Sequence, residues 1–150
     1  MIECARSVDR LLGVDLSYRH LTEVQRVREL VQSGALGEIF AVDLVFHNAY
    51  GPDKEWFYNR SLSGGGCVID LGIHLVDLAL WILGSPKVTG VSSQLFRQGK
   101  RLRAFSAEVE DYATAQIDLS TGASAQLACS WRLSAGQDAV VSASFYGTQG

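Results

Sequence analysis

The segment GGGCVIDLGIHLVDLALWILG, residues 64–84, decides the fold of this 150-residue chain. Three glycines precede a run of aliphatic residues that is long enough for several turns of helix. Aliphatic side chains occupy almost every side of that helix, which is typical of a helix buried in a core. Yet Asp70, His74 and Asp77 interrupt the run. Because an unpaired buried charge is costly, these groups must face a cleft or find partners inside the protein.

The ionisable groups share one face of the predicted helix. Positions three or four residues apart lie nearly above one another, so Asp70, His74 and Asp77 form a stripe, which Trp81 extends. A carboxylate one turn from an imidazole would orient the ring and raise its pKa, which suits proton transfer near neutral pH. The glycines at 64–66 could approach a ligand or another backbone closely, beside a helix start that favours anionic or hydroxylated ligands.

Other interpretations of the same residues stay open. Asp70 and His74 could form a surface ion pair, or His74 could be a core histidine whose ring nitrogens are satisfied. We expect a structural role for Asp77. A metal site would combine Asp70 and His74 with His47 or His20, without the close spacing that metal motifs show.

Composition and charge fit one globular domain. Apolar residues make up 47% and charged residues 19% of the sequence, and the net charge is −3. The densest basic group, Lys100, Arg101 and Arg103, lies in a predicted solvated loop, so nucleic acid is not an expected partner. The N-terminus is too charged for a signal peptide, and we expect no apolar run to reach the about 18 residues that a membrane span needs.

The three cysteines indicate a reducing environment. Cys4, Cys67 and Cys129 are odd in number, widely spaced and without a C-x-x-C pair, which argues against a disulfide framework and a structural zinc site. We therefore expect a cytoplasmic protein. A nucleophilic role for Cys67, one turn before Asp70, is a further alternative, although nothing in the neighbouring sequence marks this thiol as activated.

The flanking segments predict a sheet with helices on one face. Consecutive strands without intervening helices pair antiparallel, so we predict an α/β fold of the α+β type, with an open, mostly antiparallel sheet. The expected helices, apart from the one at 64–84, are 2–12 and 22–33, the latter starting with a Thr22-x-x-Gln25 capping box and stopping at Gly34. The expected strands are 14–18, 37–47, 87–98, 109–119, 123–133 and 139–147.

The two faces of the predicted sheet differ in polarity. Along 123–133 an apolar side, which includes Leu127 and Trp131, alternates with a side of small and polar residues such as Gln126 and Ser130. The apolar side should pack under helices. The flat polar side would meet water or a second copy of the chain.

Three pieces of the sequence resemble one known family. GALGEI at 34–39, a tryptophan at 56 in a long loop, and GGGCVIDLGIHLVDLALWILGSP at 64–86 have the order and spacing of the C-terminal domain of the glucose–fructose oxidoreductase / inositol dehydrogenase (Gfo/Idh/MocA) family. The resemblance covers roughly residues 13–150 and implies an NAD(P)-dependent oxidoreductase that acts on a sugar, a polyol or a related hydroxyl compound. Residues 1–12 would be the last helix of a missing N-terminal Rossmann domain. Residues 13–150 would be a substrate-binding and oligomerisation domain, incomplete at its C-terminus.

The resemblance also implies roles for individual residues. His74 would transfer the proton of the hydroxyl being oxidised, and Asp70 would orient it and bind substrate. No metal is implied. The residues that would border the substrate and the cofactor are, respectively, Trp56, Tyr58 and Asn59 in the loop at 48–66, and Tyr18 and Arg19 nearer the N-terminus.

The sequence departs from the family in one respect that matters for function. Neither a G-x-G-x-x-G motif after a strand nor the family's Glu-Lys-Pro motif, whose lysine joins the catalytic set, occurs. NAD or NADP would then be bound mainly by the absent N-terminal domain, and the chain alone should turn over nothing measurable.

Two alternatives to the dehydrogenase role remain. One is a non-catalytic binding or assembly module derived from the family. The other keeps the fold but uses a transient oxidation to drive lyase or glycoside-cleaving chemistry. We expect a homo-oligomer formed through the open sheet face.

Overall fold

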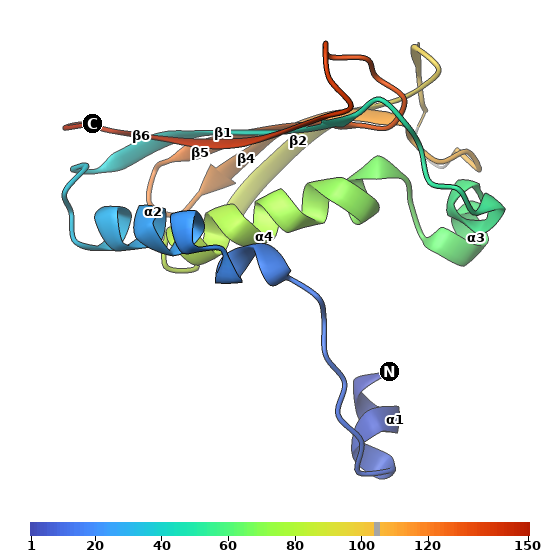
Figure 1. Ribbon diagram of the computed structural model, residues 1–150, viewed down its shortest axis with the longest axis horizontal. Helices are drawn as coiled ribbons and strands as arrows, with labels where there is room; N and C mark the ends of the chain where they lie inside the picture. Colours follow the sequence, from blue (N-terminus) through green and yellow to red (C-terminus); the bar gives the residue numbers. More distant parts are fainter. Residues whose placement is uncertain (104–105) are drawn as a thin grey trace.

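A six-stranded sheet organises the molecule, and the helices lie on one side of it (Figure 1). The computed structural model describes residues 1–103 and 106–150. The strand order is β3-β2-β4-β5-β1-β6. The strands are β1 (Ile39–Asn48), β2 (Val88–Arg97), β3 (Lys100–Arg101), β4 (Tyr112–Leu119), β5 (Ser124–Ser130) and β6 (Ala139–Gly147).

The pairing of the strands confirms an open, mostly antiparallel sheet. β2, β4 and β5 form a meander, and β6 pairs antiparallel with β1. β1 and β5 run parallel, which the sequence reasoning did not predict. The reason is that the helical connection after β1 carries the chain across the sheet, and β5 later returns beside β1 in the same direction.

Helical segments precede β1 and fill the connection from β1 to β2. In Figure 1, α2 and α4 lie beneath the sheet, while α1 stands away from the sheet and its helices. The segments are α1 (Ile2–Ser7), η1 (Ser17–His20), α2 (Thr22–Gln32), η2 (Glu55–Tyr58), α3 (Arg60–Ser63), η3 (Val68–Gly72) and α4 (Ile73–Ile82).

The core lies between α4 and the helix-facing side of the sheet. α4 contributes Leu75 and Ile82, each 1% exposed, and β1 contributes Val42 and Leu44. Burying an aliphatic side chain of this size contributes about 1.5–3 kcal/mol. On β5 the predicted apolar side, which ends in Trp131, is the buried one. The alternation read from the sequence therefore assigned the apolar side correctly, whereas Ser130, expected on the polar side, is fully buried and its hydroxyl is hydrogen-bonded to His47.

The helical run from Arg60 to Ile82 contradicts the expectation that no apolar segment is long enough for a membrane span. Its 23 residues are long and apolar enough, by length and composition only, to cross a membrane. The expectation was wrong because α3, η3 and α4 follow one another with only a short break. In this fold the run packs Leu75, Leu78 and Ile82 against the sheet, as a core helix does.

The N-terminal region differs from its prediction. The first helix ends at Ser7, and the strand expected at 14–18 is wrong, since residues 14–16 form no regular element and a short 3-10 helix begins at Ser17. Among the residues that the structure describes, no strand lies beside this segment to complete a hydrogen-bond ladder, and alternation alone cannot supply one. α2 begins at Thr22 as predicted, but without the capping box, because the Gln25 side chain donates to the Arg19 carbonyl.

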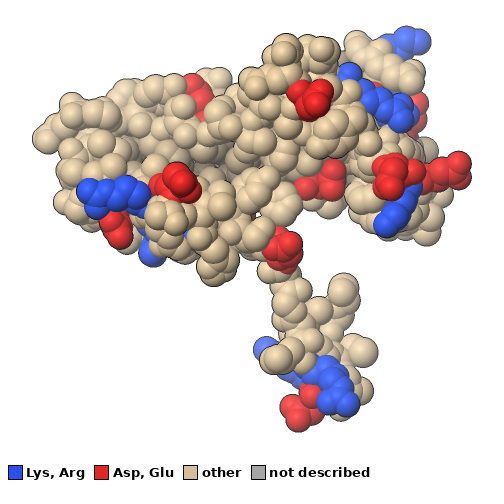
Figure 2. Space-filling view, viewed as in Figure 1, with Lys and Arg blue, Asp and Glu red and all other residues tan. Residues whose placement is uncertain are grey.

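Charged side chains of both signs occur on the face shown in Figure 2. Basic and acidic groups are interspersed there, and the basic groups do not merge into one patch.

Candidate active site

The helix that carries Asp70 and His74 begins with a π-helical turn. η3 has π geometry and passes directly into α4 at Ile73. Such turns are rare in proteins, and those that occur are frequently found at functional sites. The sequence predicted a plain α-helix here, because a 3.6-residue period in apolar residues does not reveal a single widened turn.

The glycine segment at 64–66 lies against Glu110, which the sequence reasoning did not identify. The Glu110 Oε1 atom accepts the N–H groups of Gly66 (2.9 Å) and Val68 (3.1 Å), and its backbone carbonyl accepts the N–H of Cys67 (3.0 Å). A Cβ atom on Gly66 would lie 1.9 Å from the Glu110 carbonyl oxygen. Of the two expectations for these glycines, the close approach to another backbone is the one the structure shows. The helix start therefore has a built-in carboxylate partner and is not free for an anionic ligand.

Trp131 holds the side chain of Asp70. The indole Nε1 donates to Asp70 Oδ2 at 2.9 Å, and Trp131 is only 3% exposed. A hydrogen bond to a charged acceptor is stronger than a neutral one, so this contact fixes the orientation of the carboxylate. It leaves Asp70 Oδ1 for a second donor.

Asp70 lines a cavity of about 230 Å³ where β1 leaves the sheet. The volume is below the about 300–1,000 Å³ of typical ligand pockets. The other residues that line the cavity are Asn48, Tyr50, Gly51, Pro52, Asp53, Phe57 and Trp131.

Asn48 is a polar residue of this cavity that the sequence pattern did not lead us to expect. The residue is 9% exposed, and its Oδ1 is buried without a partner in the part of the chain that the structure describes. A buried amide oxygen without a partner is costly, which sets Asn48 apart from the other residues that line the cavity. The signal was present in β1: after Val42, Leu44 and Phe46, position 48 is the next one that faces the core.

His74 lies beside Tyr18 and does not line the Asp70 cavity. The two ring centroids are 5.3 Å apart. The His74 Nδ1 atom is buried without a partner among the described residues, which leaves Nε2 as the nitrogen that can reach a ligand. Burial, with a smaller contribution from Tyr50, raises the pKa of Tyr18, so this phenol stays protonated at neutral pH.

The predicted contact between Asp70 and His74 does not form. No hydrogen bond or ion pair joins them among residues 1–103 and 106–150, because the Asp70 carboxylate points to Trp131 instead. The helical spacing placed both groups correctly on one segment. It could not show that a tryptophan 61 positions away in the sequence would donate a hydrogen bond to the Asp70 carboxylate.

Asp77 and Trp81 connect α4 to the segments before β1. Arg19 donates to both Asp77 carboxylate oxygens, through Nε at 2.7 Å and through Nη2. The guanidinium of Arg28 lies 4.3 Å from the centroid of the Trp81 ring. Asp77 thus has the structural role expected of it, and Arg19, assigned to the cofactor by resemblance, has its guanidinium bound to this carboxylate.

The three loop residues expected at the substrate lie outside the Asp70 cavity. Trp56 is exposed and stacks on Phe57, with 3.9 Å between ring centroids. Tyr58 packs its ring on Trp131 at 5.7 Å, and Asn59 caps α3 with its side-chain oxygen. Phe57 is the member of this aromatic run that reaches the cavity.

Residues 1–103 and 106–150 do not form a dinucleotide site or a metal site by themselves. A dinucleotide needs free N–H groups at a glycine-rich helix start, and at 64–66 Glu110 already binds them. Within the described ranges, no group of three or more His, Cys, Asp or Glu side chains is arranged to hold a metal ion.

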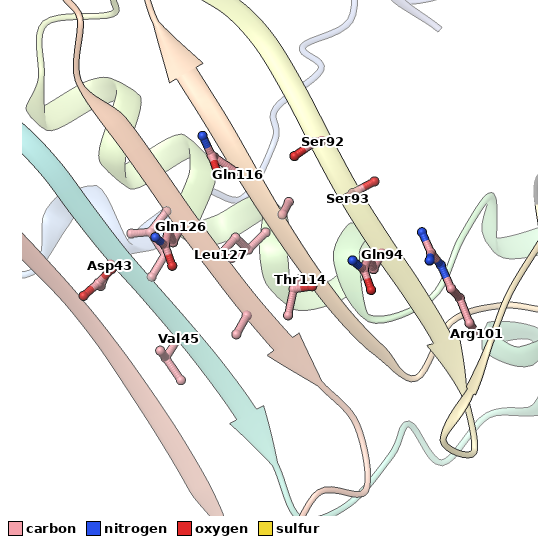
Figure 3. Close-up of a pocket in the computed structure, with 13 residues that line it drawn as sticks. Asp43, Val45, Ser92, Ser93, Gln94, Arg101, Thr114, Gln116, Gln126 and Leu127 are labelled. Atoms are coloured by element: carbon pink, nitrogen blue, oxygen red, sulfur yellow. The ribbon is translucent and has the colours of Figure 1, made fainter.

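The opposite face of the sheet carries a broad, shallow depression of about 660 Å³ (Figure 3). Its floor is built from small and polar side chains of β1, β2, β4 and β5, with Arg101 of β3 at one side (Figure 3). In Figure 1 the helices lie on the other side of the sheet. We call this surface the open face and define it by Asp43, Val45, Ser92, Gln94, Thr114, Gln116, Gln126 and Ala128.

Comparison with known proteins places this geometry in a family. Residues 24–150 match the family model described as the GFO/IDH/MocA C-terminal domain. The chain is 31% identical over 157 residues to D-glucoside 3-dehydrogenase of Escherichia coli (strain K12), an alignment that covers 98% of this chain and 45% of that protein. It is 29% identical over 126 residues to D-apiose dehydrogenase of Rhizobium rhizogenes (strain K84), covering 82% of this chain and 33% of that protein.

A solved structure has the same fold. GenD2 from gentamicin A biosynthesis, crystallised in complex with NAD, superposes with a TM-score of 0.83 and 30% sequence identity. The superposition covers 99% of this chain and 40% of GenD2. The chain thus spans less than half the length of the proteins it matches. It belongs to the GFO/IDH/MocA family, and residues 24–150 form the C-terminal domain of that family.

Proposed function

We propose that this chain is the substrate-binding part of an NAD(P)-dependent oxidoreductase that acts on a sugar or a related hydroxyl compound. The observation that carries the proposal is the Asp70 carboxylate, held through one oxygen by Trp131 beside a cavity that the amide residue Asn48 also lines. Groups of this kind bind the hydroxyls of a carbohydrate. The names of two relatives, D-glucoside 3-dehydrogenase and D-apiose dehydrogenase, support a carbohydrate substrate.

In this proposal Asp70 and His74 act on the same substrate from neighbouring turns. Asp70 Oδ1 accepts a hydrogen bond from one hydroxyl and so orients the sugar. His74 takes the proton of the hydroxyl being oxidised on Nε2, the ring nitrogen that is not buried. A bound nicotinamide supplies the hydride acceptor, which no side chain can replace. Its binding would depend chiefly on residues outside this chain.

Substitution of His74 in a longer protein that also contains a nucleotide-binding domain tests this function. His74→Ala should lower NAD(P)-linked oxidation by about 10²–10⁴-fold, the usual loss for a general base. The readout is the absorbance of reduced nicotinamide with alkyl glucosides and pentoses as substrates. His20→Ala, at an exposed histidine, is the matched control and should leave the rate unchanged. Equal rates for wild type and His74→Ala would reject the role.

We also propose that the open face pairs two copies of the chain. The face is flat, carries small and polar side chains from four strands, and has a shallow depression across its centre. An antiparallel sheet with one face uncovered by helices can either meet water or pack on its own copy. The same surface would serve the alternative function, a non-catalytic assembly module derived from the family.

A further inference from the structure

The turn in front of Asp70 is built around the side chain of Glu110. Glu110 is 6% exposed, and its Oε1 atom accepts two backbone N–H groups, from Gly66 at 2.9 Å and from Val68 at 3.1 Å. A carboxylate this deeply buried is stable only where such donors satisfy it. Val68 is the first residue of the π turn, so Glu110 binds both the approach to the turn and its first residue.

The backbone of Gly66 connects Glu110 to Asp70. The Gly66 N–H donates to Glu110 Oε1, and the Gly66 carbonyl accepts the N–H of Asp70 at 3.2 Å. The segment also lies close to the Glu110 backbone, because Cys67 donates to the Glu110 carbonyl and a Cβ on Gly66 would lie 1.9 Å from that oxygen. Gly66 therefore links the Glu110 side chain to the backbone of Asp70.

We propose that Glu110 is a positioning residue for Asp70. The reach of its side chain fixes the π turn, and the π turn directs the Asp70 carboxylate to Trp131 with one oxygen left for the cavity. The inference rests on the proposed function of Asp70 as a substrate ligand, but its structural content can be measured in this chain without substrate or cofactor. The inference also predicts that the length of the side chain at position 110 matters more than its charge. The two N–H donors need an acceptor atom at the right place, and a neutral oxygen can supply it.

The hydrogen bond from Trp131 to Asp70 provides the measurement. In the isotope-labelled full chain, the indole N–H resonance of Trp131 is assigned by comparison with Trp131→Phe, and its hydrogen-exchange rate and chemical shift are recorded. Glu110→Asp keeps the charge but is one methylene shorter, so the exchange rate should rise by about tenfold or more, the value of one charged hydrogen bond. Glu110→Gln keeps the reach and an acceptor oxygen, so it should match the wild type within about twofold.

A matched control separates positioning from a general loss of stability. Val109 is 2% exposed and adjacent to Glu110, so Val109→Ala destabilises the same place without touching the carboxylate. It should leave the chemical shift of the Trp131 indole at its wild-type value. If Glu110→Asp does not fold, Glu110→Gln, which preserves the packing, still tests the proposal, because an indole signal displaced from the wild type in this variant would overturn it.

Three outcomes would overturn the inference. They are a wild-type indole signal in Glu110→Asp, a signal in Glu110→Gln displaced as far as in Glu110→Asp, and a displacement in Val109→Ala equal to that in Glu110→Asp. Failure of the dehydrogenase assay would instead reject the proposed function and leave this measurement unaffected, so the two can fail separately.

Discussion

At the scale of single residues, Trp131 is the contact on which the candidate site depends. Trp131→Phe removes the indole N–H and leaves the half-buried Asp70 carboxylate without that donor. A hydrogen bond to a charged group is worth about 1.5–3 kcal/mol, and the smaller ring adds a packing loss, so unfolding should become easier by about 2–4 kcal/mol. Urea denaturation at neutral pH measures this. Trp56→Phe, at an exposed ring, should change stability by less than about 0.5 kcal/mol, and equal losses in both variants would contradict the assignment.

His47 makes the free energy of unfolding depend on pH. Its Nδ1 shares a 2.7 Å hydrogen bond with Ser130 Oγ, and burial lowers the pKa of His47. Below the unfolded pKa of about 6.5, the unfolded chain binds a proton that the folded chain resists, so the free energy of unfolding falls as the pH falls.

His47→Gln should therefore reduce the acid sensitivity of the protein. The loss of stability between about pH 7 and pH 5 should be smaller in the variant than in the wild type, measured as urea midpoints at constant denaturant slope. The exposed His20 provides the control, since His20→Gln should keep the wild-type dependence. A pH dependence unchanged by His47→Gln would show that other groups cause it.

The sequence located the helix of the candidate site but not the contacts of the site. Helical spacing put Asp70 and His74 on one segment, and that placement is correct. Their partners could not be predicted, because Trp131 and Tyr18 lie 61 and 56 positions away in the chain and meet them only in the folded protein. Asn48 could have been found, since it continues the core-facing alternation of β1 with a polar side chain.

At the scale of elements, the start of the helical segment is the most constrained point. A Cβ at Gly66 would lie 1.9 Å from a backbone oxygen, which cannot rotate away as a side chain could. Gly66→Ala should therefore lower the free energy of unfolding by about 3 kcal/mol or more. Thermal or urea unfolding checks this against Gly13→Ala, where an added Cβ meets nothing within 4 Å and the change should be close to neutral. Similar effects at both glycines would contradict the close approach seen at Gly66.

Periodicity predicted most elements, and its failures have physical causes. The strands β2, β4, β5 and β6 and the helix α2 follow their apolar patterns closely. The π turn of η3 escaped because it changes the backbone without changing the apolar period. The strand expected at 14–18 failed because a strand needs a neighbour, which a local pattern does not supply. The parallel pairing of β1 and β5 depends on how the chain crosses the sheet, which is a property of topology.

At the scale of the whole molecule, the open face predicts self-association. In a two-fold interface each surface meets its own copy, so a charge added at its centre faces the same charge on the partner. Gln116 and Ala128 lie on the floor of the depression, and arginine at both raises the net charge of one chain by two. Sedimentation velocity at high protein concentration should show a dimer for the wild type and a monomer for the double variant, with unchanged circular dichroism. Glu23→Arg also raises the charge by two but lies in α2 on the helix side, so it should remain dimeric. A wild type that sediments as a monomer, or a double variant that stays dimeric, would show that the open face is a solvated surface.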